Sequence, residues 1–185
     1  MILKDIVLNS ACLLNREHVV KFINGECSDN LDAKEQTDIF VFCANLVVNE
    51  LASSFFAMKK TEKVSVNNGQ IEYSIFSERP LEILSVENER GEQIPFKERG
   101  KFLELKGTKV FVTYKYLPPN YNLNDKVGFY DNRISARILA YGVVAEVCLI
   151  ERAFNESVSY RKRYSEEISI LILPKSKCVK ARRWA

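Results

Sequence analysis

The residues with the clearest chemical potential are a single histidine and an isolated carboxylate. His18 is the only histidine of the 185-residue chain, so a histidine triad or multi-histidine metal site within one chain would depend on it. It lies in the first turn of an expected helix, where a solvated or capping role is preferred. Glu50 is the only charged residue in the stretch 39–58. A buried carboxylate of raised pKa can act as a general acid, but an ion pair with Arg133 or Arg137 is the preferred interpretation.

Other catalytic and metal-binding patterns do not occur in the sequence. It contains no GxSxG, GxGxxG, P-loop or HExxH motif. Its five cysteines, at positions 12, 27, 43, 148 and 178, include no CxxC pair, which argues against a disulfide framework or a zinc site and favours reduced thiols in a cytoplasm. We therefore expect no enzyme activity, no catalytic residue, no metal and no cofactor.

The C-terminal segment "KSKCVKARRWA" has the composition either of a solubilising basic tail or of a docking peptide, and its tryptophan favours the docking peptide. It holds five cations and no acid, and the only tryptophan of the chain follows two arginines. Tryptophan and arginine are enriched among residues that fill a pocket on a protein partner. The predicted partner-binding residues are Lys175, Lys177, Lys180, Arg182, Arg183 and Trp184.

A second basic stretch, "YRKRY" at 160–164, has two interpretations. Aromatic residues interleaved with cations are typical of nucleic-acid binding. On a helix, however, Tyr160 and Tyr164 share one face while the three cations spread over the rest, as on an amphipathic surface helix. The surface helix is preferred, and a small nucleic-acid-binding module that uses this stretch and the basic C-terminus is the alternative function.

Charge is distributed unevenly along the chain. Residues 1–58 hold 4 basic and 8 acidic side chains (−4), residues 59–130 hold 12 and 10 (+2), and residues 131–185 hold 11 and 6 (+5). A basic end suits nucleic acid or an acidic protein, and ends of opposite sign also suit copies that join head to tail.

The hydrophobic pattern of the first 58 residues is helical. Asn15 can cap a helix over "REHVVKF" that stops at Gly25, and Asp32 with Glu35 resembles the capping box of a longer helix. Ile39, Cys43, Leu46, Val47, Leu51 and Phe55 follow helical spacing in that longer helix, and Phe40, Phe42, Val48 and Phe56 cover its other faces. A helix that is apolar nearly all round must be surrounded, either by its own chain or by an adjacent subunit.

From about residue 61 to 116 the pattern changes to a period of two. The runs "TEKVSV", "QIEYSIF", "LEILSV", "KFLELK" and "KVFVTYKY" predict short strands, and "NNG", "NERGE" and "KGTK" predict turns between them. Paired prolines in "LPPNYNLND" end this block. We expect a small antiparallel sheet or barrel.

The helical period then returns, with Asp131 or Asn132 as the expected cap. One stripe contains Ile134, Ile138, Tyr141, Ala145, Cys148 and Leu149, and a second contains Val158, Tyr164, Ile168, Leu171 and Ile172. A break near Asn155 favours a helical hairpin over one long helix, and Pro174 ends the helical region.

Together these segments predict an α+β fold: a helical bundle formed by the N- and C-terminal helices, with an inserted small antiparallel β sub-domain. The expected divisions are 1–60 with 128–173 for the bundle, 61–127 for the insertion and 174–185 for the docking tail. Charges interrupt "MILKDIVLNS", so no secretion signal is expected. The 39–58 stretch is too polar for a confident membrane span, so a buried helix is expected there.

The order of several segments resembles one family of structural proteins. "YDNRISARILAYGVVAEVCLIERAFNESVSYRKRYSEEI", with "VTYKYLPP" before it and "KARRW" after it, is similar to the head-tail connector or adaptor proteins of tailed bacteriophages, including tail tubular A-type proteins. "NLVVNELA", "KKTEKV" and "SERPLEILSV" extend the resemblance over most of the chain.

The resemblance implies a virion protein at the head-tail junction, made in the host cytoplasm. It implies a ring of copies, with a dodecamer as one candidate, that binds the portal protein and other tail or connector proteins. DNA would pass through the ring without sequence-specific binding, and no membrane would be involved. The segment 175–185 would dock into the neighbouring ring, with Arg182, Arg183 and Trp184 as anchors.

Overall fold

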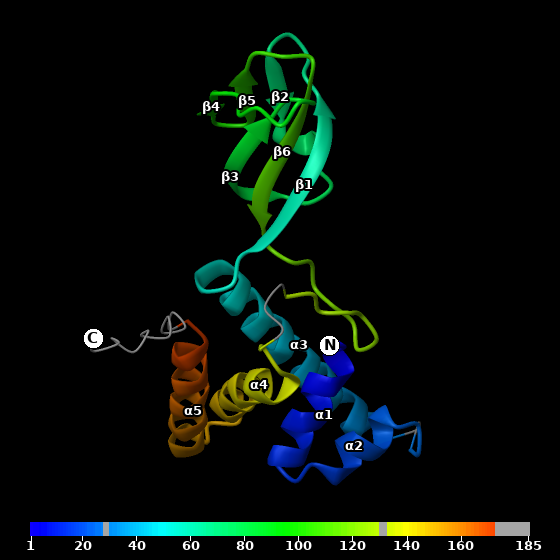
Figure 1. Ribbon diagram of the computed structural model, residues 1–185. Helices are drawn as coiled ribbons and strands as arrows, with labels where there is room; N and C mark the ends of the chain where they lie inside the picture. Colours follow the sequence, from blue (N-terminus) through cyan, green and yellow to red (C-terminus); the bar gives the residue numbers. More distant parts are fainter. Residues whose placement is uncertain (28–29, 130–132, 173–185) are drawn as a thin grey trace, which may run out of the picture. The chain divides into compact units, whose positions relative to one another are not determined.

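The computed structural model describes residues 1–27, 30–129 and 133–172. Within these ranges, five α-helices and two three-stranded antiparallel sheets make an α+β fold, and the strands lie between the N- and C-terminal helices in sequence (Figure 1). The predicted fold class is therefore confirmed.

The chain divides into two compact units. The helical unit is Met1–Ala44 with Tyr121–Ala185, and the β unit is Asn45–Asn120. The boundaries expected from sequence were 60/61 and 127/128. The β unit starts earlier because it includes the last turns of a long helix, and its first strand begins at Met58. It ends earlier because residues 121–127 bond to the N-terminus: Leu3 N donates to Asp125 O at 3.0 Å, and Val127 N to Met1 O at 3.0 Å.

The helical unit is built from α1 (Leu3–Leu13), α2 (Glu17–Ile23), the first part of α3 (Leu31–Ser54), α4 (Ala136–Ile150) and α5 (Phe154–Ile172). Helix α1 packs against α2 and α4, and α4 packs against α5 (Figure 1). Helix α4 is the most buried of these, because nearly every residue from Leu139 to Cys148 is inaccessible to solvent.

The starts of α2 and α3 differ from the expected caps. Helix α2 begins after Arg16, while Asn15 has φ +54°, outside the extended conformation of an N-cap. Helix α3 begins one residue before Asp32, and Asn30 Oδ1 accepts a hydrogen bond from Ala33 N at 3.0 Å. Asn30 therefore performs the capping role predicted for Asp32, and both predicted caps were wrong. The expected stop of α2 is confirmed: Gly25 follows the helix with φ +83°.

Helices α4 and α5 form the predicted hairpin rather than one continuous helix. Ser135 caps α4 by accepting from Ile138 N, so the predicted cap at Asp131 or Asn132, residues outside the described ranges, was wrong. Helix α4 ends at Ile150 and α5 starts at Phe154, slightly before the break expected at Asn155. Arg152 has φ +63° in this turn.

Several members of the predicted apolar stripes are exposed. Of the C-terminal stripes, Leu149, Val158 and Ile172 are exposed and Ile138 is half-buried, whereas the remaining members are buried. On α3 and just after it, the exposed apolar residues are Leu31, Ile39, Phe42, Leu46 and Phe55. The expectation that this helix is covered on all sides is therefore not met within a single chain.

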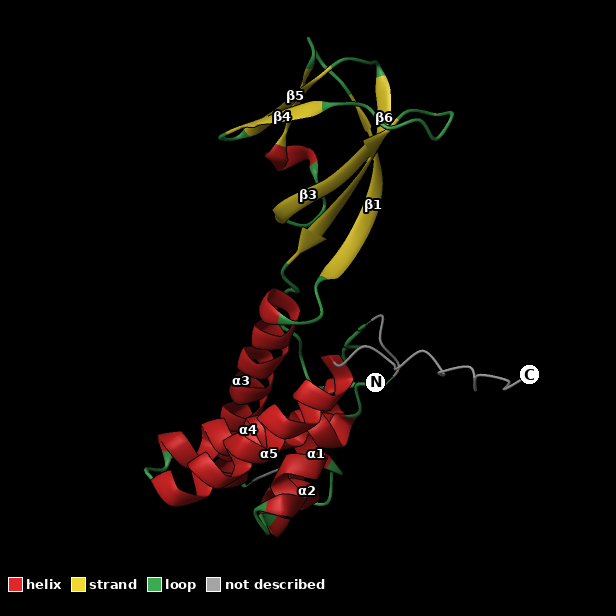
Figure 2. Cartoon of the chain, turned by 60° about the vertical axis from the view of Figure 1, so that its left-hand side comes forward, coloured by secondary structure: helices red, strands yellow, loops and turns green. Residues whose placement is uncertain are grey.

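The β unit contains two sheets that share one core. The first has the order β1 (Met58–Ser65), β6 (Lys109–Tyr116), β3 (Pro80–Glu87), and the second has the order β2 (Gln70–Glu72), β5 (Phe102–Leu105), β4 (Phe96–Arg99). Figure 2 shows these strands in yellow with the single-turn helix η1 (Tyr73–Ile75) in red. One buried cluster draws on both sheets: Val64, Ile71, Phe76, Ile83, Val86, Leu103, Leu105, Val110, Val112 and Tyr114.

The strand predictions fail at two places for identifiable reasons. "QIEYSIF" stops being a strand at Glu72 and continues as η1. Strand β4 was not predicted because its sequence "FKER" has one apolar residue and no alternation. Both errors concern the smaller sheet, whose strands are three or four residues long.

Candidate association surfaces

The predicted docking residues of the C-terminus lie outside the described residues, which end at Ile172. Their binding to a partner therefore stays a prediction. They are Lys175, Lys177, Lys180, Arg182, Arg183 and Trp184.

His18 and Glu50, the two candidates for chemistry, lie in different units. His18 is half-buried in the first turn of α2, and its Nε2 is 2.8 Å from Oε1 of Gln36 on α3. This hydrogen bond gives the imidazole a role in joining the two helices. Glu50 is half-buried on α3. Of its predicted partners, Arg133 is exposed, and Arg137 donates from Nε to the Tyr141 hydroxyl at 3.0 Å.

The "YRKRY" stretch of α5 has the amphipathic arrangement expected from its spacing. Tyr164 is buried, and Tyr160 stacks on Tyr141 of α4 with ring centroids 6.4 Å apart. The guanidinium of Arg163 lies 5.7 Å from the Tyr160 ring, and Lys162 is exposed. The tyrosines thus pack toward the helical hairpin, which leaves little ring surface on which nucleic-acid bases could stack.

One exposed surface of the helical unit lies on α3. We define the α3 outer face as Leu31, Glu35, Asp38, Ile39 and Phe42, which are all exposed; each lies three or four residues from another member of the set. The opposite side of the helix is buried. Phe42 is 58% exposed, although a phenylalanine gains about 1.5–3 kcal/mol from full burial.

A second surface is a groove between α4 and α5, with a volume of about 340 Å³. We define the α4–α5 groove by the residues that line it: Ala145, Glu146, Leu149, Ser157, Val158, Arg161, Lys162 and Ser165. Leu149 and Val158 are 50% and 70% exposed, respectively. Both belong to the apolar stripes that were predicted from sequence to face the core. In the structure they lie on the surface of the helical hairpin.

The two serines, Arg161 and Glu146 that line the groove already have hydrogen-bond or ion-pair partners. Ser157 Oγ donates to Ala145 O at 2.8 Å, and Ser165 Oγ donates to Arg161 O at 2.9 Å. The guanidinium of Arg161 forms an ion pair with Glu146 at 3.1 Å. An apolar group can therefore enter the groove without leaving these polar atoms unsatisfied.

The two surfaces carry opposite charge. The α3 outer face holds two acids, Glu35 and Asp38, and no cation. The lining of the groove holds two cations, Arg161 and Lys162, and one acid, Glu146, and Glu166 lies 4.0 Å from Lys162. The acidic face thus lies in the acidic N-terminal part of the sequence, and the groove lies in the basic C-terminal part.

The β unit holds a polar cluster that sequence reasoning missed. The Glu62 carboxylate of β1 accepts hydrogen bonds from the Tyr114 hydroxyl of β6 at 2.8 Å, from Ser77 N at 3.2 Å and from Ser77 Oγ. Lys60 Nζ lies 3.1 Å from Glu62 Oε1. Burial opposes ionisation of this carboxyl group, but the bonds from Ser77, Tyr114 and Lys60 outweigh it and lower the pKa of Glu62 to about 2.

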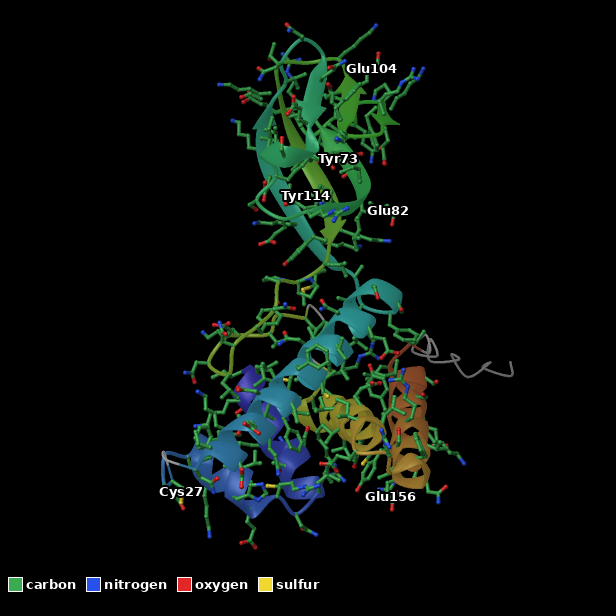
Figure 3. The ribbon with its side chains drawn as sticks, turned by 180° about the vertical axis from the view of Figure 1, so that it is seen from behind. Cys27, Tyr73, Glu82, Glu104, Tyr114 and Glu156 are labelled. Atoms are coloured by element: carbon green, nitrogen blue, oxygen red, sulfur yellow. The ribbon has the colours of Figure 1, made fainter. Side chains whose placement is uncertain are left out.

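A signal for this cluster was present in the alternation of β1. Met58, Glu62 and Val64 share one side of the strand, and Met58 and Val64 are buried. An acid on the inward side of a strand needs hydrogen-bond partners. The hydrogen-bond partners of Glu62 come from positions far away in the sequence. Figure 3 labels Tyr114 and Tyr73, which both lie in this part of the β unit. Through the Glu62 carboxylate, the cluster ties β1 and β6 to the segment that contains Ser77.

The described part of the chain contains neither a cluster of metal ligands nor a membrane-spanning helix. There, no group of three or more His, Cys, Asp or Glu side chains is arranged to hold a metal ion. No helix among the described residues has both the length and the apolar composition needed to cross a bilayer.

The chain matches no protein-family model and no curated protein.

Proposed function

We propose that this protein is a structural virion component, a ring-forming head-tail connector that joins the portal to the tail and surrounds the passage for DNA. The proposal draws on the resemblance of most of the chain to connector and adaptor proteins. In this role the protein acts through its shape and its contacts, without a catalytic step.

The observation that carries the proposal is the exposure of Phe42, Leu149 and Val158 in the helical unit of a single chain. All three lie on helices, and each gains free energy when it is covered by another protein surface. A helix that is apolar on nearly all sides fits an assembly in which a neighbouring copy supplies the missing cover.

The difference between the two surfaces supports a ring in particular. A contact between two copies of one patch produces a closed dimer, whereas a contact between two different patches leaves one of each unused. Such heterologous contacts continue from copy to copy until a ring closes or a filament grows. The α3 outer face and the α4–α5 groove are different patches of opposite charge, which favours heterologous contacts.

The experiment that tests the proposal mixes the assembled portal ring of the same virus with the full chain, and separately with a chain that ends at Leu173. Electron microscopy and a binding assay report whether a layer is added beneath the portal. A layer formed only by the full chain supports both the connector and the docking role of the C-terminal segment. A layer formed by both chains supports the connector and removes the docking role.

If neither chain binds the portal, the connector proposal is contradicted. The alternative, a small nucleic-acid-binding module, then makes its own prediction: affinity for DNA that falls steeply as the salt concentration rises. Failure to bind free DNA at low salt would dismiss this alternative as well.

A further inference from the structure

Phe42 has the position of a residue that inserts into a partner. It lies within α3, where the helix holds its side chain in a restricted set of directions. Its neighbours on the α3 outer face are Ile39, one turn earlier and also apolar, and Asp38, four residues earlier and exposed. An aromatic side chain on a rigid helix, beside one charge, is typical of an interface anchor.

The α4–α5 groove has the size and chemistry to receive one aromatic side chain. A cavity of about 150 Å³ is enough to hold benzene, and the groove measures about 340 Å³. Its lining includes the exposed apolar residues Leu149 and Val158 and the small residues Ala145 and Ser157. Ser157 already donates to Ala145 O, and Arg161 is already paired with Glu146, so a phenyl ring would displace water from mainly apolar surface.

Phe42 and the groove residue Val158 each have a charged residue one helical turn away. Asp38 lies four residues from Phe42 on α3, and Lys162 lies four residues from Val158 on α5, so each charge is one turn away from its apolar neighbour. Lys162 is 77% exposed, and its nearest acid on α5, Glu166, lies 4.0 Å away. A partner carboxylate can therefore approach Lys162 without breaking a buried ion pair.

We propose that Phe42 of one copy inserts into the α4–α5 groove of a second copy of this chain, with Asp38 of the first copy beside Lys162 of the second. This inference rests on the proposed function, since it names the contact by which copies would join. The complementary charges and the matched spacing select a second copy as the occupant. Each copy presents one Phe42 and one groove, so the contact repeats around an assembly.

The first test is sedimentation velocity of the full chain over a series of concentrations. The wild-type chain is expected to self-associate, and Phe42→Asp and Val158→Asp are each expected to weaken association by about 30-fold or more. The matched controls are Phe55→Asp, an exposed phenylalanine just after α3, and Ile170→Asp, an exposed apolar residue of α5 that does not line the groove. Both controls are expected to associate like the wild type. Circular dichroism establishes that each variant is folded.

A mixing experiment tests the pairing itself. The Phe42→Asp chain keeps an intact groove, and the Val158→Asp chain keeps an intact Phe42, so the mixture has one productive contact per pair. We expect the mixture to form one-to-one complexes that neither variant forms alone, and nothing larger. A mixture that stays monomeric while the wild type associates overturns the proposal.

Exchanging the charges at positions 38 and 162 tests whether Asp38 of one copy lies beside Lys162 of the next. Asp38→Lys is expected to weaken association, and adding Lys162→Asp to the same chain is expected to restore it, because opposite charges face each other again. A double variant that associates no better than Asp38→Lys contradicts the register. The inference is overturned if the wild-type chain stays monomeric throughout or if the Phe42→Asp chain associates normally. The connector function is contradicted only by failure to bind the portal.

Discussion

The hydroxyl of Tyr114 donates a hydrogen bond to Glu62 Oε1 at 2.8 Å, although 52 positions separate the two residues in the chain. The antiparallel register of β1 and β6 brings them together, because Tyr114 is paired with Lys60, two residues before Glu62. Tyr114 is fully buried, and its ring lies 4.9 Å from that of Phe76. One carboxylate thereby joins two strands of the larger sheet to the segment that follows η1.

The first prediction concerns acid stability. The pKa of Glu62 is about 2 in the folded chain and 4.5 when unperturbed. The ionised group therefore stabilises the fold at pH values above 4.5, and this contribution is lost as the pH falls toward 2. Glu62→Gln should destabilise the β unit at pH 7 by roughly 2 kcal/mol and remove this part of the acid dependence.

Urea unfolding monitored at a series of pH values between 7 and 2 measures this effect. The control is Glu82→Gln, which removes an exposed carboxylate paired with Lys115 on the same sheet. It should leave the pH dependence close to that of the wild type. If Glu62→Gln unfolds with the wild-type pH profile, the carboxylate does not have the role assigned to it.

The second prediction separates the ring of Tyr114 from its hydroxyl. Tyr114→Phe keeps the buried ring and removes one donor to Glu62, so it should cost about 1 kcal/mol and raise the pH at which the acid transition begins. Tyr114→Ala also leaves a cavity in the core and should cost about 3–5 kcal/mol. Chemical denaturation of both variants measures the two costs. Equal losses would mean that the hydroxyl, rather than core packing, dominates.

The general order of the elements was predictable because the hydrophobic period changes along the chain. Positions three or four apart are apolar in α1 to α3, α4 and α5, whereas alternate positions are apolar from about Met58 to Tyr116. The exact helix starts were less predictable, because several capping residues stand close together. Asn30 and Asp32 are both good caps, and the helix starts where Asn30 can accept the bond from Ala33 N.

The two association surfaces could not be located from spacing alone. Leu149 and Val158 have the same periodic positions as residues that are buried, such as Cys148 and Tyr164. Whether such a residue is covered depends on where α4 ends and how α5 packs on it, which are tertiary properties. The Glu62 cluster likewise depends on strand register, which no short window of sequence contains.

The third prediction concerns thiol reactivity. Burial, followed by the nearby negative charge of Glu146, raises the pKa of Cys43 to about 12, and burial also raises the pKa of Cys148. Cys12 and Cys27 are exposed free thiols. Because the thiolate is the reactive form, iodoacetamide at pH 8 should modify Cys12 and Cys27 well before the two buried cysteines.

Mass spectrometry of digested samples, taken during the reaction, gives the rate at each of these four positions. The same reaction in denaturant should bring the four rates close together, since burial is then lost. Rapid modification of Cys43 in the folded chain would show that α3 opens in that region or that the thiol is accessible.

The fourth prediction concerns Trp184, which lies outside the described residues. If the tryptophan fills a pocket on the portal, Trp184→Ala should weaken portal binding by about 2 kcal/mol, because interface anchors of this type contribute at least that much. Trp184→Phe should lose less, since it keeps an aromatic ring. Titration of the assembled portal ring with each chain measures the loss. Self-association through Phe42 should be unchanged in both variants, which separates portal docking from contacts between copies. Unchanged portal binding by Trp184→Ala would remove this residue from the docking hypothesis and leave the cations of the segment as its candidates.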